Sequence, residues 1–238
     1  MRTFKSLPLA LAAALSLSLA ACAGEGEGAA ASTPTASTTT AKPTTSTSGR
    51  TAADLTKALL VLGDLPTGFS EEKDDPSDDT KPFSSSSSRR ADLVDYLNAD
   101  RAPGAKVSVQ RSFSGGPEGP FVDFGLDAMG STDAVAKLRA SFKKAVNACA
   151  KVTLTIADQG KSPMQVEQID APQFGTKPYA FRLTGTSGPL RGREVTMAIA
   201  AVEDVVVSVS LMAGQEGELE GATEAAVTKA QQILKKRA

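Results

Sequence analysis

The chain has 238 residues, no His and no Trp, and carries 26 basic against 27 acidic side chains. This near balance, without a clustered excess of Lys and Arg, argues against a nucleic-acid-binding surface. The lack of His removes the commonest general base and metal ligand, and no Gly-rich nucleotide-binding motif is present. We therefore expect no metal and no cofactor.

The first residues have the pattern of an export signal. Arg2 and Lys5 precede an apolar run from Leu7 to Ala20, which is too short for a comfortable membrane-spanning helix. The run ends in Leu19-Ala20-Ala21-Cys22, which resembles the bacterial lipobox. In lipobox proteins the thiol of this Cys receives a diacylglyceryl group and the chain is cleaved just before it. An additional acyl chain, palmitate for example, would make the anchor stable.

We accordingly predict a lipoprotein signal peptide over residues 1–21 and lipidation at Cys22. The mature protein would be held by lipid on the extracytoplasmic face of the cell membrane. A plain secreted protein with a chance Cys is the alternative. Loss of Arg2 and Lys5 lowers the basic count from 26 to 24 against 27 acidic residues, which gives a net charge of −3.

Residues 22–50 are predicted to form a disordered tether. The stretch is rich in Gly, Ala, Ser, Thr and Pro and cannot bury enough apolar surface to offset its ordering entropy. Its Thr-rich composition suits O-glycosylation, and a bare spacer is an equal alternative.

Helices and an acidic stretch open the predicted domain, which spans residues 51–238. Thr51 and Asp54 have capping-box spacing, and Gly63 is expected to end the first helix. Its apolar face would be formed by Leu55, Leu59 and Leu62. Residues 71–88 are acidic and then Ser-rich, and they predict a solvated loop rather than a Ca²⁺ site, because EF-hand spacing is absent. A second helix is predicted over 89–98.

Period-two alternation then predicts antiparallel strands. They cover 107–113, 122–127, 151–156, 163–169, 179–184, 195–201 and 205–211. The second strand carries Asp123 and Asp127 on one face, which we interpret as its solvated face. A catalytic carboxylate pair is the alternative.

Two longer helices are predicted, over 131–150 and from Gly217 to the C-terminal residues. Ser131 or Thr132 would cap the first, and Cys149 falls on its apolar stripe, as a core residue rather than a reactive thiol. Both helices are expected to cover one face of the sheet. The predicted fold is α+β: a single curved antiparallel sheet of six or seven strands packed against two main helices, with N-terminal helices, in one monomeric domain.

Parts of the sequence resemble a group of actinobacterial cell-surface lipoproteins. These segments are Asn147-Ala148-Cys149-Ala150, Phe181-Arg182-Leu183, Val202 to Val209 and Leu65-Pro66-Thr67-Gly68-Phe69. Such lipoproteins look like the extracellular sensor domain of a mycobacterial serine/threonine kinase. The resemblance implies a surface-exposed binding or sensing domain and no enzyme. Those sensor domains use paired cysteines, so a disulfide-framed cleft cannot be carried over to a domain whose one cysteine is Cys149.

Three functions follow in order of preference. The first is a non-catalytic, ligand-binding or sensor-like lipoprotein domain, whose partner is a protein, a small molecule or a lipid. The second is a lipid or glycolipid carrier with an apolar cavity between sheet and helices. An enzyme comes third, since without His it would need a Ser-Lys or carboxylate pair such as Asp123 and Asp127.

Overall fold

The structure is a computed structural model that describes residues 49–73, 81–86, 91–156, 159–215 and 217–235. The predicted signal peptide, Cys22 and most of the predicted tether lie outside the described residues. The helices are α1 (Ala52–Ala58), α2 (Ala91–Leu97), α3 (Thr132–Ala148) and α4 (Glu218–Leu234), with a 3₁₀ turn, η1, at Leu62–Asp64. The strands are β1 (Ser70–Glu72), β2 (Phe83–Ser84), β3 (Val107–Ser114), β4 (Phe121–Ala128), β5 (Lys151–Ile156), β6 (Gly160–Ile169), β7 (Thr176–Gly185), β8 (Glu194–Val202) and β9 (Val205–Met212).

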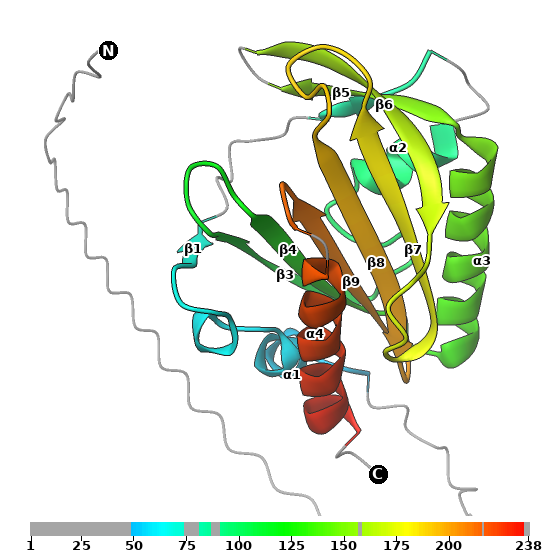
Figure 1. Cartoon of the computed structure of the whole chain (residues 1–238). Coiled ribbons are helices and arrows are strands. Elements are labelled where there is room, and N and C mark those ends of the chain that lie inside the picture. The colour runs from blue at the N-terminus through cyan, green and yellow to red at the C-terminus, as the bar shows by residue number, and fades with distance from the viewer. Residues whose placement is uncertain (1–48, 74–80, 87–90, 157–158, 216, 236–238) are drawn as a thin grey trace, which may run out of the picture. The chain divides into compact units, whose positions relative to one another are not determined.

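One antiparallel sheet forms the centre of the described fold (Figure 1). Its strand order is β1-β3-β4-β9-β8-β7-β6-β5-β2. All seven predicted strands are present, but the sheet has nine, so the prediction of six or seven was too low. The two extra strands, β1 and β2, are three and two residues long and lie at opposite edges of the sheet. Strands this short leave no alternation to detect.

The helices lie on both faces of the sheet. Helices α1 and α4 cover one face, and α2 and α3 cover the other (Figure 1). The expectation that the two long helices share a face was wrong. An apolar stripe shows which side of a helix is buried, but it does not show which face of the sheet buries it.

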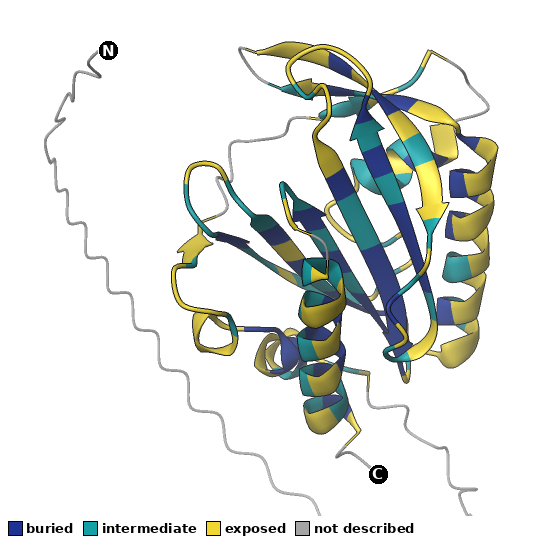
Figure 2. Cartoon of the chain, in the orientation of Figure 1, coloured by how far each residue is buried: buried dark blue, intermediate teal, exposed yellow. Residues whose placement is uncertain are grey.

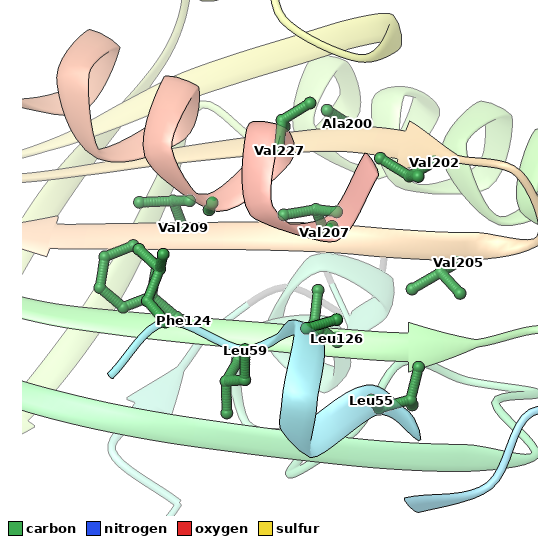
Figure 3. Close-up of a cluster of buried hydrophobic side chains, with 14 of the residues drawn as sticks. Leu55, Leu59, Phe124, Leu126, Ala200, Val202, Val205, Val207, Val209 and Val227 are labelled. Atoms are coloured by element: carbon green, nitrogen blue, oxygen red, sulfur yellow. The ribbon is translucent and has the colours of Figure 1, made fainter. Parts of the chain in front are cut away.

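The core under α1 and α4 is built on one side of β4 and β9 (Figure 3). Strand β9 directs Val205, Val207 and Val209 to this side, and α4 meets them with Val227. Thr223 is also buried on α4, and its hydroxyl donates to the Leu219 carbonyl at 2.6 Å, which satisfies the polar group within the helix.

Helix α1 is shorter than predicted. Its capping box of Thr51 and Asp54 is confirmed, but it ends at Ala58, and Leu59 is already extended. The chain then runs extended so that Leu60 is 1 % exposed, while Leu62 in η1 is 43 % exposed. The sequence could not predict this, because a Leu-rich run is compatible with either backbone.

The core under α2 and α3 centres on aromatic side chains. Phe142 of α3 makes edge-to-face contacts with Tyr96 on α2 and with Tyr179 and Phe181 on β7. Ser131 is the N-cap of α3, which settles the choice between Ser131 and Thr132. Helix α3 is buried on its sheet side and exposed on its outer side (Figure 2).

Cys149 is part of this core. It is 1 % exposed, and its thiol donates to the Lys151 carbonyl at 3.4 Å. The prediction of a core residue is confirmed.

Arg50 fixes the point where the chain enters the domain. Its Nε lies 2.6 Å from Oδ1 of Asp204 in the β8–β9 turn, and its Nη1 donates to the Leu234 carbonyl at 3.2 Å. Within the described residues, no helix is long and apolar enough to cross a membrane.

Candidate ligand-binding groove

A groove opens on the α2/α3 side of the sheet, over β3, β4, β9 and β8. Its volume is about 370 Å³, within the range of small-molecule sites. Three features define it: a polar floor, an apolar wall and a loop that closes one side.

The polar floor comes from alternate residues of three adjacent strands. Because side chains alternate between the two faces of a strand, residues paired in register point to the same side. Strand pairing places Ser112, Asp123 and Ser210 in one row across β3, β4 and β9. A second row consists of Gln110, Gly125 and Ser208.

The apolar wall follows directly from the floor. Met197 pairs with Ser210 and Ile199 pairs with Ser208, so β8 continues both rows with apolar side chains. Helix α3 adds Leu138 and Phe142 above them. A ligand in the groove would therefore meet hydrogen-bonding groups on one side and apolar groups on the other.

The end of α2 and the loop over residues 98–105 form the remaining wall. Asn98 accepts from the Phe83 N–H at 2.9 Å and donates to the Phe83 carbonyl at 2.7 Å, so α2 is fastened to β2. Asp127 on β4 fastens the loop, because its Oδ1 accepts from the Ala102 N–H at 3.1 Å and from the Ser108 hydroxyl at 2.5 Å.

Asp127 is a buried carboxylate, which corrects the prediction of a solvated residue. It is only 8 % exposed. Burial raises the pKa of Asp127 above its ordinary value, although the hydrogen bonds from Ser108 and Ala102 and the charge of Arg101 oppose the shift. The residue is placed to hold the groove loop, whereas Asp123 is exposed on the floor.

The two carboxylates do not form a hydrolytic pair. They are four residues apart on one strand, which separates their Cα atoms by about 13 Å at about 3.3 Å per residue. Retaining and inverting glycosidases place their carboxyl groups about 5 to 9.5 Å apart. The loop contacts of Asp127 also commit it to a structural role.

The acidic and Ser-rich stretch contributes only a few described residues, and its Glu71 and Glu72 do not line the groove. Glu71 and Glu72 form most of β1, and residues 74–80 and 87–90 of the acidic and Ser-rich stretch lie outside the described residues. Among the residues that the structure describes, no group of three or more His, Cys, Asp or Glu is placed to hold a metal ion.

The serines of the floor were not predicted from the sequence. They occupy the outward positions of predicted strands, where long charged side chains are common on a solvated sheet face. Small polar residues and a glycine stand there instead: Ser108, Ser112, Gly125, Ser208 and Ser210. This bias toward small side chains was the available signal for an open groove.

Comparison with known proteins supports the fold alone. No protein-family model and no curated protein sequence matches the chain. Among solved structures, the chain is similar to the extracellular domain of PknH from Mycobacterium tuberculosis, with a TM-score of 0.60 and 17 % identity. The similarity covers 79 % of this chain and 98 % of that domain. The described fold is therefore similar to that of the PknH extracellular domain, which is consistent with the sensor-domain resemblance noted in the sequence.

Proposed function

We propose that this protein is a membrane-anchored lipoprotein whose extracytoplasmic domain binds a small ligand in the groove without catalysis. The groove, with its polar floor and apolar wall, is the observation that carries the proposal. Lipid on Cys22 provides the anchor, and the domain acts as a monomer. The similarity in fold to an extracellular domain supports the location.

The groove favours a small, partly polar ligand over the alternative of a carried lipid. Its volume of about 370 Å³ is at the low end for ligand sites, and its floor presents hydroxyl, amide and carboxylate groups. A long acyl chain would leave these polar groups without hydrogen-bond partners, which costs free energy. The two hydrophobic cores, one on each face of the sheet, are filled by packed side chains, so neither offers a cavity for an acyl chain.

The anchor is tested by Cys22→Ala in the full chain. We expect the unsubstituted protein to incorporate radiolabelled palmitate and to sediment with membranes, because acylation is what retains it there. The variant should lose both properties. Label and membrane retention that persist in Cys22→Ala would remove the lipid anchor from the proposal.

Binding is tested by filling the groove. Ser210→Phe places a large ring on the floor, and Gln165→Phe places the same ring on an exposed position of β6. Full-length Cys22→Ala protein carrying either change is incubated with the low-molecular-weight fraction of the producing cells and examined by native mass spectrometry. We expect a bound small molecule with Gln165→Phe and with the parent, and none with Ser210→Phe. An adduct in all three proteins, or in none, would contradict a binding function of the groove.

A further inference from the structure

We propose that the ligand of the groove is a sugar, recognised by its hydroxyl groups on the floor and by the apolar side of its ring on the wall. This inference rests on the proposed binding function and adds the chemical class of the ligand. It is carried by three observations: the spacing of the floor groups, the position of the apolar wall and the charges around the groove.

The floor presents a grid of mixed donors and acceptors. Ser112, Asp123 and Ser210 lie on neighbouring strands, which are about 4.8 Å apart. The second row, two residues further along each strand, lies about 7 Å away. A serine hydroxyl both donates and accepts, as a sugar hydroxyl does, and a carboxylate accepts from two neighbouring hydroxyls. A polyhydroxylated ring is the small ligand that uses such a grid most fully.

Gly125 lowers the floor at its centre. A Cβ at this position would lie 2.5 Å from Oγ of Ser208, so any side chain would displace that hydroxyl. With glycine, the Ser208 hydroxyl lies over β4, where a ligand hydroxyl would meet it. The glycine therefore leaves room for the Ser208 hydroxyl on the floor of the groove.

The apolar wall lies on β8, the strand next to β9 and its floor serines. Met197 continues the row of Ser210, and Ile199 continues the row of Ser208. A sugar ring has C–H groups between its hydroxyls, and packing them on these side chains and on Phe142 removes apolar area from water. A ligand that is polar on every side would gain nothing from contact with this apolar wall.

The charges argue against other polar ligands. The groove is lined by three carboxylates, Asp100, Asp123 and Asp127, and by one cation, Arg101. This excess of negative charge repels phosphate and carboxylate ligands. Asp127 is committed to the loop, so the floor has one exposed carboxylate among several neutral groups, which suits a neutral sugar better than a polycation.

The test measures sugar binding directly. Full-length Cys22→Ala protein is titrated with glucose, mannose, galactose, arabinose, N-acetylglucosamine, maltose and trehalose, and binding is followed by saturation-transfer NMR and calorimetry. Spermidine, inorganic phosphate and decanoate serve as comparison probes. We expect at least one sugar to bind and the comparison probes not to bind.

Variants then locate the site. Ser112→Ala with Ser210→Ala removes two floor hydroxyls and should weaken sugar binding about 4- to 100-fold, at about 2- to 10-fold per hydrogen bond. Thr153→Ala with Thr155→Ala removes two hydroxyls from β5 on the opposite side of the sheet and should leave the affinity unchanged. Equal sugar affinity in both double variants would overturn the assignment to the groove.

The remaining outcomes separate the ligand class from the binding function. Spermidine or decanoate binding in place of every sugar would overturn the sugar but leave a binding groove. The sugar would likewise be overturned, and the binding groove kept, if no probe binds but mass spectrometry shows a bound small molecule that Ser210→Phe removes. If neither experiment shows binding, the sugar and the proposed function both fail. Co-sedimentation with insoluble cell-wall glycan, competed by the bound sugar, would assign a glycan chain as the source, and its absence would assign a free sugar.

Discussion

Tyr179 lies in the core under α2 and α3, and its hydroxyl has no hydrogen-bond partner among the described residues. The residue is 6 % exposed, and burial raises the pKa of Tyr179. A buried hydroxyl without a partner costs free energy relative to an apolar group of the same shape. We therefore expect Tyr179→Phe to raise the free energy of unfolding by about 1 kcal/mol.

Urea unfolding followed by circular dichroism measures this effect. Tyr96→Phe is the matched control, because Tyr96 contacts the same Phe142 ring but is only half-buried. Its effect should stay within about 0.5 kcal/mol. A loss of stability in Tyr179→Phe would show that the hydroxyl has a partner in solution.

Asp64 and Asp127 should give stability a pH dependence of opposite sign. Burial acts to raise the pKa of Asp64, but the hydrogen bonds from Lys229 and from the Val61 N–H outweigh it, so the pKa is lowered from 3.8. Its contribution is present above pH 3.8 and is lost as the pH falls through the lower folded pKa. The pKa of Asp127 is raised from 3.8, so the folded state binds its proton more tightly, and stability is lost as the pH rises through the folded pKa.

Unfolding free energies at about pH 3 and pH 7 distinguish the two residues. Relative to the parent, Asp64→Asn should be more destabilising at pH 7 than at pH 3, by up to about 1 kcal/mol, as for a surface ion pair. Asp127→Asn should be less destabilising at pH 7 than at pH 3, since the parent then carries the cost of a buried charge. The same sign of pH dependence in both variants would contradict the opposed shifts.

The burial of Asp127 was not predictable from its own strand. Alternation on β4 correctly assigns Val122, Phe124 and Leu126 to one face and Asp123 and Asp127 to the other. What covers that other face is decided by the loop after α2, which is distant in the sequence. A strand pattern therefore predicts sidedness, but it does not predict whether the polar side meets water.

At the scale of elements, prediction succeeded where a pattern lasted for several residues. The seven longer strands, the four predicted helices and the turn at Glu203 and Asp204 are all present. The short edge strands β1 and β2 depend on partners supplied by β3 and β5, so their own sequences carry little signal.

The placement of α3 and α4 on opposite faces of the sheet likewise could not be predicted from the sequence pattern. It explains how the groove arises. Because α4 lies on the far side, α3 is the one long helix on the groove side, and the floor of β3 and β4 beside it remains accessible. Two long helices on the same face, as predicted, would have covered that floor.

The whole described domain should unfold as one unit although it has two cores. Strand β9 contributes Val205 and Val207 to one core and Val206 to the other, so neither core can open without exposing shared strands. We expect Leu55→Ala on α1 and Leu183→Ala on β7, one in each core, each to cost about 2 to 5 kcal/mol within a single transition.

Two probes test this cooperativity. The chain has two tyrosines, Tyr96 and Tyr179, and both lie on the α2/α3 side, so tyrosine fluorescence reports that core alone. Far-UV circular dichroism reports all elements. The two signals should coincide even in Leu55→Ala, whose change is on the other side. Circular dichroism that falls first in this variant would indicate two separate units.

The Arg50 contacts have a consequence for protein engineering. Because Arg50 reaches the carbonyl of Leu234, the chain enters and leaves the folded region at one place. Domains with adjacent ends tolerate circular permutation and insertion into loops of other proteins. Residues 50–234 should therefore be suitable for insertion into a loop of a host protein, joined through both ends. The groove would stay open in such a fusion.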